Sequence, residues 1–205
     1  MVAIIDYGVG NLFSLRASLH HLGIEAEVMS DPANIDTAER VILPGVGAFG
    51  DAMEKLRACG LVEVLDRQVQ VGKPLLGICL GMQLLFDSGY EFGTHRGLGY
   101  LKGSVFPLAD DIPKDMKIPH IGWNNLLLTK PEDLLLKYTN RGDSVYYVHS
   151  FYVKGCEDSL VAGSDYGVFV PGAVHRNNIF GTQFHPEKSG TVGLQMLKAF
   201  AEAQV

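Results

Sequence analysis

The feature that most constrains this chain is an alternation, over residues 2–86, of short apolar segments with segments of helical periodicity. Four short apolar runs predict strands, at residues 2–5, 26–29, 41–43 and 75–78. Between them, leucines recur at helical spacing, as at positions 12, 15, 19 and 22, and Asp51 is expected to cap a later helix. Apolar strands separated by helices indicate a parallel sheet, because both of its faces must then be covered. We therefore expect an α/β fold with an open, mostly parallel central sheet flanked by helices.

The second half of the chain has a different pattern. Residues 97–184 contain short β-rich runs with frequent glycine, proline and asparagine, such as 144–148 and 178–184. These runs predict antiparallel or mixed additions to the sheet. A closing helix is expected at residues 191–202. Because a chain of 205 residues leaves little room for two cores, we expect one domain over residues 1–205.

Composition and charge disfavour several classes of protein. Hydrophobic residues make up 47% of the chain and charged residues 20%, which is ordinary for a globular domain. The formal net charge of -6, without a cluster of Lys and Arg, disfavours binding to nucleic acid or to an anionic membrane surface. No apolar run reaches the roughly 18 residues of a membrane span, and the N-terminal segment lacks the basic start of a signal peptide. We therefore expect a cytoplasmic protein.

The three cysteines, Cys59, Cys79 and Cys156, are odd in number and widely spaced. This spacing indicates neither a disulfide framework nor a metal site, so we expect no metal and no cofactor. Cys79 stands out because it lies in Gly77-Ile78-Cys79-Leu80-Gly81, where the fourth predicted strand turns into a helix. This segment has the form of a nucleophile elbow with cysteine in place of serine.

At such an elbow the sulfur of Cys79 stands clear of the sheet, and the N–H of Leu80 lies at a helix N-terminus. The helix dipole favours a thiolate there, and the free N–H can stabilise a developing oxyanion. The alternative is a buried, inert cysteine after a core strand, because free cysteine is among the most buried residue types. The flanking glycines favour the nucleophile.

A thiol nucleophile needs a general base, and seven histidines are available. His185 directly follows a predicted strand, and functional groups gather at the carboxyl ends of strands in open α/β sheets. Glu187 follows two residues later, where its carboxylate could orient the imidazole as the third member of a triad does. His149 also follows an apolar strand and is either a second base or a structural residue. The remaining histidines lie on a predicted helix or in turn-like segments without a supporting pattern, at positions 20, 21, 95, 120 and 175.

Three segments, in this order along the chain, resemble the class I (triad) glutamine amidotransferases: Pro44-Gly45-Val46-Gly47, Gly77-Ile78-Cys79-Leu80-Gly81-Met82-Gln83 and His185-Pro186-Glu187. Further segments are similar to a narrower family, the glutaminase subunits of imidazole glycerol phosphate synthase, among them Asp6-Tyr7-Gly8, Gly122-Trp123-Asn124 and Tyr147-Val148-His149-Ser150. The resemblance implies a flavodoxin-like fold. It also implies that Cys79, His185 and Glu187 hydrolyse glutamine to glutamate and ammonia through a glutamyl thioester.

The same resemblance implies roles for residues around the triad. The backbone N–H groups of Val46 and Leu80 would form the oxyanion hole. Glu91 would hold the α-ammonium group of the substrate, within a substrate-binding set that comprises Gly45, Gln83, Glu91 and Ser150. The residues implied at a partner interface are Asn11, Trp123 and Lys188.

The partner in this family is a cyclase subunit with a (β/α)8-barrel fold. It receives the ammonia and makes imidazole glycerol phosphate and the carboxamide ribonucleotide AICAR in histidine biosynthesis. Such a barrel needs about 250 residues, so the resemblance implies a separate partner chain and a heterodimer.

Several features have a second interpretation. Gly8-x-Gly10 after the first strand suggests a nucleotide-binding loop, but a dinucleotide fingerprint needs glycine where Phe13 stands. Trp123 is expected in a turn between Gly122 and Asn124-Asn125, as either partly buried core or interface surface. Lys188 is either a solvated charge or a residue near the partner. Two other functions compete: a glutaminase for pyridoxal phosphate or anthranilate synthesis, and a catalytically silent regulatory subunit. The Asp6-Tyr7-Gly8 opening and the Trp123 segment argue against the first, and the intact triad argues against the second.

Overall fold

The computed structural model describes residues 1–205. Its first half confirms the predicted alternation of strands and helices, with β1 (Val2–Ile5), α1 (Leu12–His21), β2 (Ala26–Met29), α2 (Pro32–Ile35), β3 (Arg40–Gly45), α3 (Phe49–Ala58), α4 (Leu61–Gln70), β4 (Leu75–Cys79) and α5 (Leu80–Leu84). The remainder is mainly strands, with β5 (Ser88–Gly89), β6 (His95–Arg96), β7 (Ser104–Pro107), β8 (His120–Asn125), β9 (Leu127–Leu128), β10 (Ser144–His149), β11 (Phe151–Lys154), β12 (Leu160–Asp165), β13 (Phe169–Arg176) and β14 (Ile179–Thr182). Three short 3-10 helices and a closing helix complete the chain: η1 (Leu108–Asp110), η2 (Leu134–Leu136), η3 (Pro186–Lys188) and α6 (Gly190–Glu202).

One large sheet forms the centre of the molecule, with the strand order β2-β1-β3-β4-β14-β13-β12-β9. The strands from β2 to β14 in this order are parallel. They share the 2-1-3-4-5 order of flavodoxin-like sheets. β13, β12 and β9 continue the sheet in antiparallel fashion, and two smaller sheets, β10-β8 and β11-β7-β5-β6, lie beside it. This arrangement confirms the expected parallel sheet with antiparallel and mixed additions.

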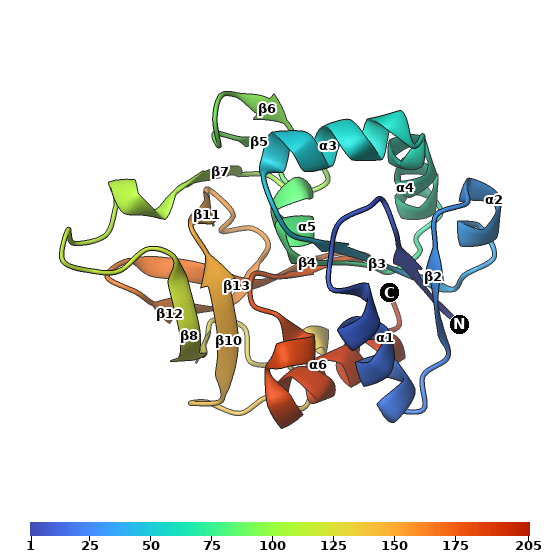
Figure 1. The fold of residues 1–205 in the computed structure, drawn as a ribbon. Coiled ribbons are helices and arrows are strands. Elements are labelled where there is room, and N and C mark those ends of the chain that lie inside the picture. Colours follow the sequence, from blue (N-terminus) through green and yellow to red (C-terminus); the bar gives the residue numbers. More distant parts are fainter.

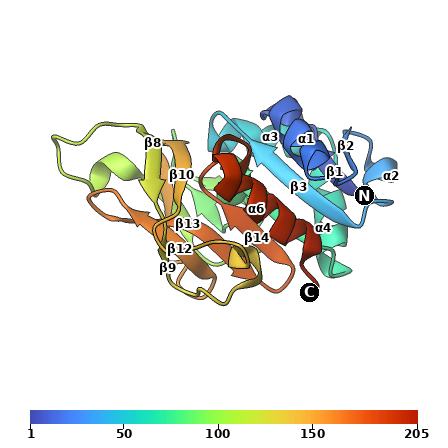
Figure 2. The ribbon, with the colours of Figure 1, turned by 90° about the horizontal axis from the view of Figure 1, so that it is seen from below.

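Helices cover both faces of the parallel half of the sheet (Figure 1). α3, α4 and α5 lie on one face, and Figure 2 shows α1 and α6 on the other. Successive side chains of a strand point to opposite faces. Ala3 and Ile5 therefore pack in the core cluster with residues of α3 and α4, whereas Val2 and Ile4 pack in the cluster with residues of α1 and α6. None of the helices combines the length and apolar character needed to cross a membrane.

Two local expectations were wrong. Gly122 and Trp123 are not in a turn but in β8, where Trp123 pairs with Tyr146 of β10 in an antiparallel ladder. The glycine and asparagines of this segment favour a turn in the sequence pattern. In the structure, exposed and less exposed residues alternate along it, as expected for a strand. Asp51 does not cap α3, because that helix already begins at Phe49 and its N-cap residue has no side-chain hydrogen bond. The backbone N–H of Phe49 instead donates to the carboxylate of Glu91, a residue far away in the sequence, at 2.8 Å.

The turn from β4 into α5 packs its backbone directly against the neighbouring strand. A Cβ atom added at Gly81 would lie 1.8 Å from the carbonyl oxygen of Leu43 in β3. A Cβ atom at Gly77 would lie 2.6 Å from the carbonyl oxygen of Gly81. Both contacts are with backbone atoms, which cannot rotate away. Only glycine permits α5 to begin this close to the sheet.

Gly81→Ala should therefore destabilise the fold severely. We expect a loss of more than about 3 kcal/mol in the free energy of unfolding, because the overpacked methyl group meets rigid backbone. Urea denaturation measures this loss. Gly23→Ala is the matched control, since Gly23 has a positive φ of 70° but open space around it. It should cost only the left-handed backbone strain of about 1 to 2 kcal/mol. Equal costs at the two positions would contradict the packing argument.

Candidate active site

Cys79 ends β4 and stands at the N-cap position of α5, with φ 55° and ψ -112°. This is a strained conformation for a residue other than glycine, and such strain persists only where the surrounding structure holds it. Cys79 is in register with Gly45 of β3, and β14 pairs with β4 on its other side. The expected elbow is therefore present, between two strands that end at the same edge of the sheet.

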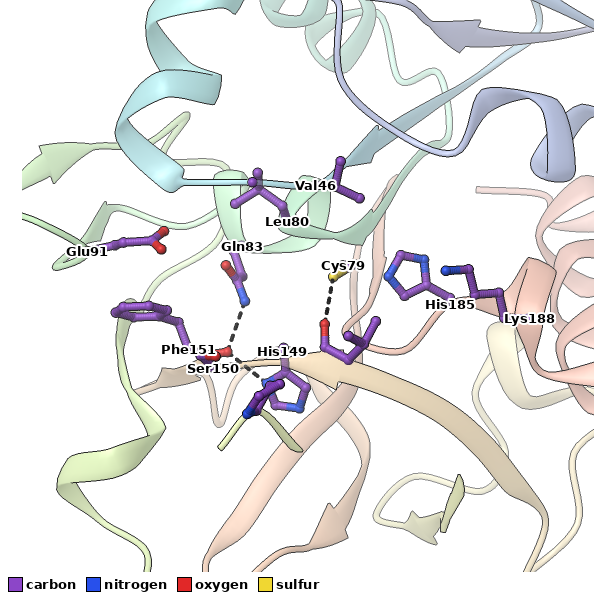
Figure 3. Close-up of a pocket in the computed structure, with 13 residues that line it drawn as sticks. Val46, Cys79, Leu80, Gln83, Glu91, His149, Ser150, Phe151, His185 and Lys188 are labelled. Atoms are coloured by element: carbon purple, nitrogen blue, oxygen red, sulfur yellow. Dashed lines mark hydrogen bonds between the residues drawn. The ribbon is translucent and has the colours of Figure 1, made fainter. Parts of the chain in front are cut away.

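His185 follows β14 at this edge and faces Cys79 (Figure 3). Its Nδ1 lies 2.8 Å from Oε1 of Glu187, and the two side chains are only 4% and 3% exposed. The backbone N–H of His185 donates to the carbonyl oxygen of Tyr146 in β10, at 3.0 Å. β10 therefore anchors the backbone of His185, and the carboxylate of Glu187 holds its ring by Nδ1. The structure brings the three residues of the predicted triad together.

The electrostatics of the site favour the protonated form of His185. Burial alone would lower the pKa of His185, but hydrogen bonds with Cys79 and Glu187, and the negative charges of both, raise it to about 10. The second carboxylate oxygen of Glu187 is buried without a hydrogen-bond partner. An isolated buried carboxylate is costly, so a protonated imidazole beside it compensates its charge. At neutral pH this arrangement holds a proton on His185, beside the sulfur of Cys79.

A cleft of about 440 Å³ opens in front of the sulfur. That volume lies within the range of small-molecule sites. The residues that line it are Val46, Gly47, Cys79, Leu80, Gln83, Glu91, Pro119, Val148, His149, Ser150, Phe151, His185 and Lys188. Gly45 is the one predicted substrate residue outside this lining. It lies behind the cleft, where an added Cβ would be 2.8 Å from the backbone nitrogen of Gly81.

The three other predicted substrate residues lie along the cleft. Figure 3 shows Glu91 and His185 on opposite sides of Cys79. One carboxylate oxygen of Glu91 accepts from the first N–H of α3. Gln83 is buried and donates from Nε2 to the carbonyl oxygen of Phe151, at 3.0 Å, and to Oε1 of Gln183, at 2.9 Å. Ser150 follows β10 directly, and its side chain is on the lining of the cleft.

The three predicted partner residues gather around η3. Lys188 belongs to η3 and is exposed. Trp123 is 59% exposed, and its ring lies 3.7 Å from the Cβ position of Gly190, just after η3. Asn11 is the N-cap residue of α1, a helix that contacts η3. Trp123 is therefore surface and not core. It lies beside η3, which carries Lys188 and contacts the helix that begins after Asn11.

Two residues at the site had no assigned role in the sequence. Tyr7 is buried and donates its hydroxyl to the carbonyl oxygen of Pro44, at 2.9 Å, which anchors the loop that carries Val46. Burial, and then the charge of Cys79, raise the pKa of Tyr7 so that it stays neutral. Gln183 is fully buried, and its Nε2 lies 3.8 Å from Sγ of Cys79. A polar residue within the apolar run before His185 is the signal that could have identified Gln183.

His149 and His120 form a buried pair, and no sequence pattern indicated a role for His120. Nε2 of His149 lies 3.0 Å from Nδ1 of His120, and Nδ1 of His149 lies 2.9 Å from the carbonyl oxygen of Phe151. A carbonyl only accepts, so Nδ1 of His149 is the donor and Nε2 the acceptor. Burial lowers the pKa of His120 to about 4 and that of His149 to about 3, the latter with help from its histidine neighbours. His149 is thus a neutral, fully engaged residue.

Comparison with known proteins agrees with this geometry. The family described as glutamine amidotransferase class-I matches residues 3–203. An imidazole glycerol phosphate synthase subunit HisH from Caldanaerobacter subterraneus subsp. tengcongensis is 48% identical over 203 residues, which cover 98% of each chain. The corresponding subunit from Bacillus subtilis is 46% identical and covers 98% of this chain and 96% of its own.

Solved structures with lower identity share the fold. A glutamine amidotransferase crystal structure superposes with a TM-score of 0.75 at 19% identity, covering 98% of this chain and all of the other. The structure of PurLQS from Thermotoga maritima gives a TM-score of 0.74 at 19% identity, covering 98% and 96% of the two chains.

The chain belongs to the class I glutamine amidotransferase family, and it is an enzyme of that class. Within this family it belongs with the HisH subunits of imidazole glycerol phosphate synthase, which it matches over nearly its whole length.

His149→Gln should make the stability of the protein less sensitive to acid. In the unfolded chain an imidazole binds a proton below its ordinary pKa of about 6.5, whereas folded His149 stays neutral down to about 3. The folded state therefore loses stability as the pH falls below 6.5, by about 1.4 kcal/mol per pH unit for this one proton. Urea unfolding between about pH 5 and 6 should show a slope shallower by that amount in the variant. His20→Gln, an exposed change on α1, should keep the parent slope, and a parent-like slope in His149→Gln would contradict the assignment.

Proposed function

We propose that the chain hydrolyses the side-chain amide of glutamine to glutamate and ammonia through a thioester on Cys79, as the glutaminase subunit of imidazole glycerol phosphate synthase. The observation that carries the proposal is the placement of Cys79 in front of a buried His185–Glu187 pair, at the floor of a cleft sized for a small molecule. The family membership supports glutamine as the substrate.

In the first half-reaction the Cys79 thiolate attacks the amide carbon of glutamine. The carbonyl oxygen becomes an oxyanion, and the N–H of Leu80 at the start of α5 is a donor for it, with the N–H of Val46 from the neighbouring loop as the second. His185 gives its proton to the amide nitrogen, the carbon–nitrogen bond breaks, and ammonia leaves. The product on the enzyme is a γ-glutamyl thioester of Cys79.

In the second half-reaction water takes the place that ammonia left. His185, now neutral, removes a proton from the water as its oxygen attacks the thioester carbon. The same donors stabilise the second oxyanion, and the carbon–sulfur bond then breaks to release glutamate and restore the thiolate. Glu187 keeps the imidazole oriented and stabilises its charged form through both steps.

The cleft also offers groups that would hold the amino-acid end of glutamine. Glu91 supplies a negative charge for the α-ammonium group, and Ser150 supplies a hydroxyl. Both N–H groups of Gln83 are already used, so its Oε1 is the atom left to accept a hydrogen bond from the substrate. Gly45 contributes by its small size, since the loop could not otherwise approach Gly81.

The relatives are named as subunits of a synthase, which supports a partner chain for this one. The partner in this proposal is a (β/α)8-barrel cyclase that uses the ammonia to make imidazole glycerol phosphate and AICAR. The interface in this proposal is the face around η3, where Asn11, Trp123 and Lys188 gather beside the cleft. Exposed tryptophan is characteristic of binding hot spots.

Cys79→Ala should abolish glutaminase turnover without unfolding the chain, because it removes the nucleophile and leaves a small cavity at the end of a strand. Ammonia release is measured with the cyclase partner present, and thermal unfolding confirms the fold. Cys59→Ala is the control, since Cys59 is exposed and lies outside the cleft. With ammonium salt supplied in place of glutamine, the Cys79→Ala complex should still make product. Parent-like ammonia release by Cys79→Ala would contradict the proposed mechanism, in which Cys79 is the nucleophile.

Trp123→Ala should weaken binding of the cyclase by about thirtyfold or more, as expected for a hot-spot residue. Titration calorimetry with the cyclase subunit measures the affinity, and glutaminase activity of the parent should rise as the complex forms. Val71→Ala is the control. Val71 is 70% exposed but precedes β4, at the opposite edge of the sheet from Cys79. Unchanged affinity in Trp123→Ala would place the interface elsewhere.

A further inference from the structure

Gln183 lies directly behind the proposed nucleophile. It follows β14, two residues before His185, and none of its side chain is exposed. Its Nε2 is 3.8 Å from Sγ of Cys79, within the range of a hydrogen bond to sulfur. Gln183 does not line the cleft, so it approaches the sulfur from the interior of the protein while the substrate approaches from outside.

The hydrogen bonds around Gln183 determine which end of its amide faces the sulfur. The carbonyl oxygen of Phe151 can only accept, so the atom of Gln83 that lies 3.0 Å away must be Nε2. The same Nε2 lies 2.9 Å from the amide of Gln183, and the atom there must therefore be the oxygen. This leaves the NH2 group of Gln183 to face Cys79.

The Phe151 carbonyl that sets this direction is itself held in place. It also accepts from Nδ1 of His149, at 2.9 Å, and His149 in turn accepts from His120. Both histidines stay neutral in the buried pair, so the direction of every bond in this chain is constant across neutral pH. A reversal of the Gln183 amide would place two NH2 groups against each other at Gln83, with both buried.

Two neighbours act on the sulfur in opposite ways. The carbonyl oxygen of Val148, 4.0 Å away, can accept a hydrogen bond from a thiol and repels a thiolate. The NH2 group of Gln183 donates, and so favours the thiolate. In a site where burial disfavours charge, the balance between these two dipoles affects how much thiolate is present.

We propose that Gln183 donates a hydrogen bond to the Cys79 thiolate from behind and so stabilises the attacking form of the nucleophile. This inference rests on the proposed function, in which the thiolate is the attacking species. It adds a fourth side chain to the triad and gives Gln183 a role that differs from substrate recognition.

The test is the pH dependence of Cys79 alkylation by iodoacetamide, followed by mass spectrometry of the Cys79 peptide in a Cys59→Ala background. Gln183→Met, which has a similar shape but no donor, should move the midpoint of thiolate formation upward by about one pH unit or more, because a charged acceptor loses a hydrogen bond. Gln183→Asn withdraws the amide by one methylene and should move it in the same direction. The kcat profile for ammonia release should shift with the alkylation midpoint.

Thr182→Val is the matched control. Thr182 is the preceding residue, is fully buried, and has a hydroxyl without a hydrogen-bond partner, so its loss should leave the midpoint unchanged.

A purely structural role for Gln183 would lower the melting temperature and leave the midpoint at the parent value, and that result in either folded variant would overturn the proposal. If neither variant folds, the side-chain amide NMR signal of Gln183 in the parent decides: it should titrate with the alkylation midpoint, and a flat signal overturns the proposal. Alkylation needs neither glutamine nor a partner. The alkylation midpoint can therefore be interpreted even if the proposed glutaminase reaction is wrong.

Discussion

The close backbone contact between Gly81 and Leu43 sets the geometry on which the rest of the site depends. It allows α5 to start immediately against β3, which forces the chain at Cys79 into a strained turn and lifts the sulfur out of the sheet. Because β3 leads directly into the loop at Val46, the same contact places Val46 and Gly47 on the lining of the cleft with Cys79. The cleft, the loop and the elbow are consequences of one packing arrangement of glycines.

Two buried histidines near Cys79 have opposite charge states, and their partners explain the difference. His185 has a carboxylate behind it and a thiol in front, and these raise its pKa despite burial. His149 has only a carbonyl and other histidines as neighbours, so burial dominates and lowers its pKa. Burial alone therefore does not decide which histidine carries a proton here. The negative partners decide it.

Much of this structure could be predicted from the sequence because the relevant signals are local. Apolar strands and helical spacing gave the parallel sheet, and Gly77 to Gly81 gave the elbow. The side chains that the sequence left without a role, His120 and Gln183, depend on contacts between distant segments: β8 with β10, and β14 with α5. Trp123 was placed in a turn because glycine and asparagine surround it, whereas pairing with β10 overrides that local preference.

The position of β14 has a consequence for how the enzyme is made. β14 is the last strand of the chain, yet it lies between β4 and β13 and is the sole link between the parallel strands and the antiparallel ones. It also carries the segment that ends in His185. The ribosome must therefore have released the chain past His185 before the two parts of the sheet can join and His185 can meet the sulfur of Cys79. A nascent chain therefore holds Cys79 on a partial sheet, and the completed core and the meeting of Cys79 with His185 arise in the same late step.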